Sequence, residues 1–122
     1  MTVKNSYERF LDECGITREL DDAVRNYTGD LDLRDIEGVS LRKSTIHGQG
    51  VFADKFYVAG YGAGWASLNG KRTIIGRYTN HSDNPNCTVM PTAYGIILVT
   101  LESIAIGDEM TIDYRDALNA AD

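Results

Sequence analysis

Cysteine and proline are scarce in this chain, and no apolar run is long. Only two cysteines and two prolines occur among its 122 residues. Cys14 and Cys87 are too few for a zinc cluster and show no disulfide pattern, so we expect two small buried thiols and no metal site. No stretch reaches the length of a membrane span, and the first residues lack the layout of a signal peptide. We therefore expect a protein that is not secreted, acts without a membrane, and resides in the cytoplasm or, in a nucleated host, the nucleus.

Basic side chains are outnumbered by acidic ones. The sequence has 12 Lys and Arg against 18 Asp and Glu, which gives a net charge of −6. Since a free-standing nucleic-acid binder carries a basic face, this charge argues against a direct nucleic-acid partner. Ten of the acidic side chains lie in residues 1–38, against five basic ones. That surplus either belongs to solvated helix faces or steers a lysine-rich partner toward the rest of the chain.

The first 38 residues carry two helical patterns. Asn5 and Glu8 form a capping pair at the start of the first helix, which Gly15 ends. Thr17 and Gly29 bound the second helix in a similar way. Apolar residues spaced by three and four positions are Tyr7, Phe10, Leu11 and Cys14, then Leu20, Val24 and Tyr27. Since a chain of this length fits one domain, we expect residues 1–38 to be an N-terminal helical extension packed on a domain of residues 39–122.

Short β-like runs separated by turn residues fill the chain from residue 39 onward. These runs cover residues 39–43, 50–56, 73–75, 87–90, 94–101 and 110–114. Asn69-Gly70 is a strong turn signal, and the glycines between Tyr61 and Trp65 indicate a twist or bulge. Residues 96–99 are apolar without alternation, which is typical of a strand buried on both faces. The sequence therefore predicts a mainly β fold of several small sheets with short N-terminal helices.

Three polar segments are set among these runs. The central one, residues 76–87, reads Gly-Arg-Tyr-Thr-Asn-His-Ser-Asp-Asn-Pro-Asn-Cys. Alone it is as typical of a surface turn as of a site, because its residues are common in turns and Pro85 prevents a helix at Asn84. Residues 44–53 read Ser-Thr-Ile-His-Gly-Gln-Gly-Val-Phe-Ala, and residues 105–114 read Ala-Ile-Gly-Asp-Glu-Met-Thr-Ile-Asp-Tyr. In this order, over roughly residues 39–115, the segments closely resemble the SET-domain protein-lysine methyltransferases, most of all the minimal stand-alone members of viruses and microbes.

The resemblance implies a fold, a reaction and a partner. The fold is a β-clip of several small sheets in which a C-terminal segment threads beneath a preceding loop. The reaction moves a methyl group from S-adenosyl-L-methionine to the ε-amine of a lysine in a protein or peptide substrate. The cofactor carries most of this chemistry, and the protein supplies orientation and electrostatics. Some minimal members complete their site by dimerising, so a homodimer is a further expectation.

The resemblance also assigns residues to the site. The implied cofactor-binding residues are His47, Gly48, Gln49, Gly50, Arg77, Asn80, His81 and Tyr114. Tyr114 is also the implied catalytic residue, because its hydroxyl would orient the methyl group and add negative potential at the transition state. Without the resemblance, the glycines would be a tight turn, His81 a structural histidine and Tyr114 a core residue. No dedicated base is required, because a narrow channel and the sulfonium both disfavour a charged lysine.

Several positions depart from the family pattern. Asp83 stands where a cysteine is usual, and only eight residues follow Tyr114, so the usual C-terminal lid is missing or very small. Leu68 and Val89 stand where some relatives have channel tyrosines. Aromatic residues that could replace them are Tyr61, Trp65, Tyr78 and Tyr94, and the degree of methylation stays open. Two other interpretations also stay open: a SET-like module that binds peptide or cofactor without turnover, and a related β-clip domain that is structural or binds a sugar acid.

Overall fold

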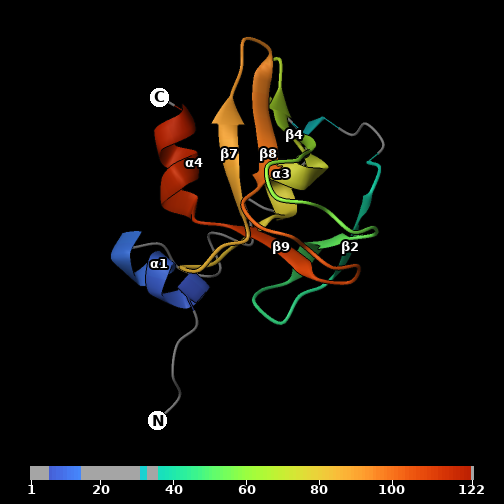
Figure 1. Cartoon of the computed structure of the whole chain (residues 1–122). Coiled ribbons are helices and arrows are strands. Elements are labelled where there is room, and N and C mark those ends of the chain that lie inside the picture. The colour runs from blue at the N-terminus through green and yellow to red at the C-terminus, as the bar shows by residue number, and fades with distance from the viewer. Residues whose placement is uncertain (1–5, 15–30, 33–35, 122) are drawn as a thin grey trace.

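The computed structural model describes residues 6–14, 31–32 and 36–121 (Figure 1). Its strands form one sheet of five and one of four, with short helices beside them. This arrangement confirms the predicted mainly β fold. The helix expected between Thr17 and Gly29 lies outside the described residues, as does the side chain of Cys14. No helix within the described ranges is long and apolar enough to cross a membrane.

The larger sheet has the strand order β1-β5-β4-β8-β7. Its strands are β1 (Leu31–Asp32), β5 (Lys71–Thr73), β4 (Gly62–Leu68), β8 (Gly95–Thr100) and β7 (Cys87–Pro91). The predicted Asn69-Gly70 turn joins β4 to β5, and both residues have a positive φ, as a two-residue type I′ turn requires. The predicted bulge is confirmed too, because the register of β4 on β8 shifts between residues 62 and 64 and again between 65 and 67.

Strand β8 corrects one expectation. Residues 96–99 are not buried on both faces: Leu98 and Thr100 are buried, whereas Ile97 and Val99 are only half-buried. One face of β8 therefore packs in the core and the other meets solvent in part, as is common in antiparallel sheets. The apolar run correctly predicted a strand, but its lack of alternation did not mean that both faces of the strand are buried.

The smaller sheet has the strand order β2-β3-β9-β6. Its strands are β2 (Val39–Lys43), β3 (Gln49–Ala53), β9 (Glu109–Ile112) and β6 (Asn80–His81). β9 lies between β3, its antiparallel neighbour, and β6, its parallel neighbour. The segment after β6 remains in contact with β9, because the side chain of Asn86 donates to the Glu109 carbonyl and accepts from the Thr111 N–H, at 2.9 Å each. All three motif segments therefore meet in this sheet.

The expected apolar run at residues 73–75 is not a single extended segment. Thr73 ends β5 and caps the short helix α3 (Ile74–Tyr78). Its hydroxyl oxygen accepts a hydrogen bond from the Gly76 N–H at 3.2 Å, which satisfies a donor in the first turn. The local cap therefore decides that the chain turns into a helix just before the central motif.

The last strand also ends earlier than expected, at Ile112 rather than at Tyr114. Asp113 accepts a hydrogen bond from the Arg115 N–H at 3.0 Å and so caps the helix α4 (Tyr114–Ala121). Tyr114 is therefore the first residue of a helix, and its backbone is fixed by both the strand before it and the helix after it.

Both sheets contribute to the main core. Its most deeply buried members include Val51, Ala53, Leu98, Ile104 and Met110. Cys87 is buried here as predicted, and desolvation raises the pKa of its thiol to about 12. Helix α1 (Ser6–Cys14) buries Tyr7, Phe10 and Leu11 in a second cluster, which confirms its predicted apolar face. Figure 1 shows α1 and α4 on the same side of the molecule.

Candidate functional site

Three strands of the smaller sheet bring the motif segments to one place. β3 carries Gly50, β6 consists of Asn80 and His81, and β9 begins at Glu109. Parallel pairing sets Asn80 opposite Thr111 in β9. Gly50, Asn80 and Glu109 thus lie side by side, although long stretches of sequence separate them.

The side chain of Asn80 is completely buried and ties the three segments together. Its Nδ2 donates to the carbonyl oxygens of His47 at 3.1 Å and Gln49 at 3.2 Å. It also donates to Oε2 of Glu109 at 2.8 Å. Because all three neighbours are acceptors, the amide nitrogen of Asn80, and not its oxygen, faces His47, Gln49 and Glu109.

The two glycines of the first segment are required for different reasons. Gly48 has a φ of +46°, and a Cβ added there would meet nothing within 4 Å. Gly50 is buried, and a Cβ added there would collide with the carboxylate of Glu109. Glycine suits the left-handed conformation at Gly48 and the close approach of Glu109 at Gly50, because it has no Cβ. The backbone of this segment therefore packs tightly on its inner side, while Gly48 leaves space on its outer side.

The imidazole of His81 is completely buried, and both of its nitrogens are engaged. Nδ1 accepts a hydrogen bond from the Tyr114 N–H at 2.9 Å. The proton of the neutral ring therefore lies on Nε2, which donates to Oδ1 of Asp83 at 3.0 Å. The partner of Nε2 is thus a carboxylate. His81 connects the central motif to the start of α4.

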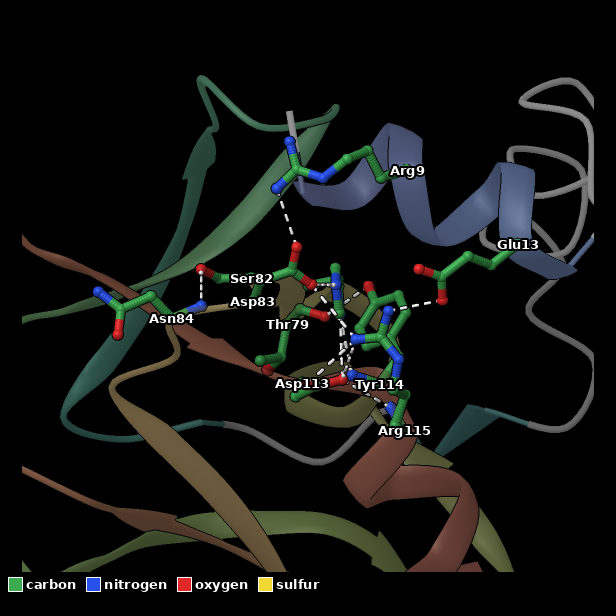
Figure 2. Close-up of polar contacts among 10 residues, drawn as sticks. Arg9, Glu13, Thr79, Ser82, Asp83, Asn84, Asp113, Tyr114 and Arg115 are labelled. Atoms are coloured by element: carbon green, nitrogen blue, oxygen red, sulfur yellow. Dashed lines mark hydrogen bonds and ion pairs between the residues drawn. The ribbon is translucent and has the colours of Figure 1, made fainter. Parts of the chain in front are cut away.

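Asp83, the residue that replaces the usual cysteine, gathers several charged partners. Arg9 donates to its Oδ2 at 2.9 Å, and Arg115 donates to its Oδ1 at 3.3 Å (Figure 2). These bonds lower its pKa below the ordinary range, with Arg9 the largest cause and His81 the next. The carboxylate is therefore ionised at neutral pH and anchors α1 to the central motif.

The hydroxyl of Tyr114 is held in a defined position. It donates to the carbonyl oxygen of Thr79 at 2.9 Å, so two oxygens from different segments lie together (Figure 2). The ring of Tyr114 contacts Phe10 edge-on, with 5.3 Å between centroids, and lies 5.1 Å from the ring of His81. Ring packing and the hydrogen bond together fix this side chain.

Helix α1 covers the motif residues, which the sequence did not predict. The ring of Tyr7 stacks on His47 at 4.5 Å, and the ring of Phe10 stacks on His81 at 4.8 Å. At the far end of the helix, Glu13 accepts from Arg115 at 2.6 Å (Figure 2). The apolar spacing indicated a buried face on α1, but spacing alone cannot say which segment that face meets.

The structure brings most of the predicted site residues together. His47 and Gln49 accept hydrogen bonds from Asn80, Gly50 lies beside it, and His81 bonds to the backbone of Tyr114. Arg77 is buried in α3, three positions before Asn80, and its role stays a prediction. Sequence reasoning missed Ser44, Thr79 and Glu109. All three lie within the quoted motifs, yet no pattern in the sequence places them at the site.

A cavity of about 490 Å³ lies elsewhere, against β4. Tyr61 and Trp65, two of the aromatic residues considered for the lysine channel, line it together with Tyr57, Lys55 and Glu37. None of the predicted cofactor-binding residues borders this cavity. The hydrogen-bonded cluster around Asn80, rather than this cavity, is therefore the candidate site.

Comparison with known proteins identifies a family and a similar fold. A family model described as a SET domain matches residues 8–115. Among solved structures, the chain is similar to a candidate histone methyltransferase of Plasmodium falciparum, with 19% identity and a TM-score of 0.53. That match covers 66% of this chain and 95% of the Plasmodium chain, and at this identity it concerns the fold alone. No curated protein matches the sequence. The family match begins within α1, and the predicted domain boundary at residue 38 stays a prediction.

Proposed function

Because the chain belongs to the SET-domain family, we propose that it is a protein-lysine methyltransferase with S-adenosyl-L-methionine as its methyl donor. The observation that carries the proposal is the meeting of the three motifs around Asn80. Gly50, Asn80 and Tyr114 occupy the matching motif positions, and the contacts of Asn80 and His81 hold them in one cluster. The proposed substrate is a lysine-containing protein or peptide.

The residues of the cluster fit such a cofactor. Gly48 offers an exposed backbone with open space where a side chain would stand, as close approach of a ligand requires. Asn80 adds a fixed amide beside that backbone. We propose that His47, Gly48, Gln49 and Gly50 contact the cofactor through their backbone, together with Asn80, His81, Arg77 and Tyr114. When bound, S-adenosyl-L-methionine supplies a methyl group on a positively charged sulfur.

The hydroxyl of Tyr114 is the proposed catalytic group. Its hydrogen is directed to the Thr79 carbonyl, so its oxygen lone pairs face other directions and present negative potential. An oxygen held in this way stabilises developing positive charge without reorganising during the reaction. His81 is not available as a base, because its Nδ1 and Nε2 are both engaged. The lysine proton is therefore expected to leave to water.

The experiment has two readouts that separate the proposal from its alternatives. Calorimetry with S-adenosyl-L-methionine or its demethylated product tests whether the protein holds the cofactor. Transfer of an isotope-labelled methyl group to lysine-rich proteins, located by mass spectrometry, tests turnover. Binding together with methyl-lysine formation supports the proposal. Binding without turnover favours a SET-like module that has lost catalysis, and no binding contradicts the proposed function.

A further inference from the structure

The cavity against β4 is lined by aromatic residues and by one of the chain's own lysines. Tyr57, Tyr61 and Trp65 line it, together with Lys55 and Glu37. Its volume of about 490 Å³ lies in the range of small-ligand sites, about 300–1,000 Å³. None of the proposed cofactor-binding residues is among its lining residues. A ligand in this cavity would therefore be held by residues outside the candidate site described above.

Tyr57 is a rigid wall of the cavity. Its backbone N–H donates to the Ile104 carbonyl, and its own carbonyl accepts from the Ile104 N–H, at 2.9 Å each. At the other end of the side chain, the hydroxyl donates to the Gly38 carbonyl at 2.8 Å. Gly38 has a φ of +75°, and a Cβ there would collide with the Tyr57 hydroxyl, so glycine permits this close approach. The buried ring of Tyr57 is thus oriented before any ligand arrives.

Tyr61 forms a second wall at a steep angle to the first. The two ring centroids are 5.5 Å apart, and the ring planes are inclined at 61°. The backbone of Tyr61 is held on both sides, because its N–H donates to Oγ1 of Thr100 and its carbonyl accepts from the Thr100 N–H, at 2.9 Å each. Tyr61 is also exposed. The two aromatic faces therefore form a corner that solvent reaches.

The ammonium of Lys55 occupies this corner. Its Nζ lies 5.2 Å from the ring centroid of Tyr57 and 5.0 Å from that of Tyr61. Both distances are within the separation of about 6 Å at which an aromatic face attracts a cation. Because Lys55 is exposed, water competes for its ammonium, and the contact holds it only weakly. The corner thus accommodates the end of a lysine side chain, and its present occupant can be displaced.

We propose that this cavity binds a methylated lysine side chain of another protein, with Lys55 displaced into solvent. The inference goes beyond the proposed function and does not depend on it. Each added methyl group replaces an N–H that water would solvate, so a methylated ammonium costs less to desolvate while the ring faces still attract its charge. The carboxylate of Glu37, which lines the same cavity, also favours a cation. No bond forms or breaks, so the site retains a methylated protein without reacting with it.

Trp65 provides a direct readout, because it lines the cavity and is the only tryptophan of the chain. The probe is the peptide Gly-trimethyllysine-Gly, titrated into the whole protein without cofactor. We expect a saturable change in tryptophan fluorescence, with calorimetry as a second measurement of the same affinity. The same peptide with unmodified lysine should bind at least about fivefold more weakly.

Tyr61→Leu and Tyr61→Phe form a matched pair at an exposed position. Leucine keeps apolar volume and removes the aromatic face, so binding of the trimethyllysine peptide should weaken about fivefold or more. Phenylalanine keeps the face, so binding should stay within about twofold of the parent. Lys55→Ala should strengthen binding, because the chain's own ammonium no longer competes. Lys71→Ala makes the same change at an exposed position outside the lining of the cavity and should have no effect.

Equal affinity for the methylated and unmethylated peptides would overturn the inference, and so would equal losses in the two Tyr61 variants or no saturable binding. Loss of binding in Tyr114→Phe, with Tyr61→Leu like the parent, would place the ligand at the proposed catalytic group and overturn it too. A failure of the proposed function is a different result, because it appears as absent cofactor binding or absent methyl transfer, and neither enters these titrations.

Discussion

At the scale of single residues, the hydroxyl of Tyr114 is the atom on which the proposed chemistry depends most. Tyr114→Phe deletes only this hydroxyl and leaves the ring packed against Phe10 and His81. We expect the fold and cofactor binding to remain. Methyl transfer should fall about a hundredfold or more, the scale for losing one preorganised polar group at a reacting centre. A methylation assay run beside cofactor calorimetry measures both.

Tyr94→Phe is the control for this change. Tyr94 is one of the aromatic residues considered for the lysine channel, but it is 71% exposed in the turn between β7 and β8, so deletion of its hydroxyl should leave methyl transfer unchanged. A Tyr114→Phe protein that folds, binds cofactor and turns over within a few-fold of the parent would show that the active oxygen lies elsewhere. Tyr61 and Tyr78 would then be the next residues to test.

At the scale of elements, α1 depends on aromatic packing more than on charge. Phe10 is 7% exposed and contacts both His81 and Tyr114. Phe10→Ala should release α1 from the motif, with a loss of stability of at most about 3–5 kcal/mol. Hydrogen exchange should accelerate in residues 6–14 and change little in β3 and β9.

The contrasting variant is Arg9→Ala, which removes the ion pair between Arg9 and Asp83. The two side chains are 51% and 37% exposed, and such pairs contribute about 0–1 kcal/mol. Exchange in α1 should therefore stay close to that of the parent. Equal acceleration in the two variants would mean that the ion pair holds the helix as strongly as the aromatic packing does.

The link between α1 and the central motif also predicts a dependence on pH. The pKa of Asp83 is lowered in the folded protein, chiefly by its hydrogen bond from Arg9. Its ionised form therefore stabilises the fold above the unfolded-state pKa of about 3.9, and this contribution is lost as the pH falls from there toward the folded-state pKa. The effect is moderated by solvent, because the carboxylate is partly exposed.

Asp83→Asn removes this contribution. The drop in the free energy of unfolding between neutral pH and pH values well below 4 should be smaller in the variant than in the parent, as measured by urea denaturation. Asp108→Asn, at an exposed position of the 107–108 turn, should keep the parent's full drop. The same drop in Asp83→Asn and the parent would exclude Asp83 as the titrating group.

At the scale of the whole molecule, Asn80 joins segments from three parts of the chain. Asn80→Ala leaves the carbonyls of His47 and Gln49 and the carboxylate of Glu109 without this donor. We expect the free energy of unfolding and the free energy of cofactor binding each to weaken by about 1–3 kcal/mol. Chemical denaturation and calorimetry measure the two effects separately.

Asn84→Ala provides the comparison, because Asn84 is exposed in the same motif. It should change neither stability nor binding appreciably. Undiminished cofactor binding by Asn80→Ala would remove Asn80 from the site. The expected homodimer stays a prediction, and so does the set of aromatic residues around the substrate lysine.

Features that depend on neighbouring residues could be predicted from the sequence. The apolar spacing of α1, the Asn69-Gly70 turn and most of the β-strands were predicted because each is determined within a few positions. The three motifs and their order could be read in the same way. The ends of β5 and β9 were predicted wrongly. Thr73 and Asp113 act as helix caps there, and the β-like composition of the residues around them gave no sign of a helix.

Only the tertiary structure decided which distant residues meet. It placed Glu109 behind Asn80, paired β6 with β9, and laid Phe10 on His81. None of these contacts follows from local propensity, because each depends on the path of the chain between its partners. The sequence by itself therefore determined which residue types are available for the site, and chain topology determined their orientation and their partners.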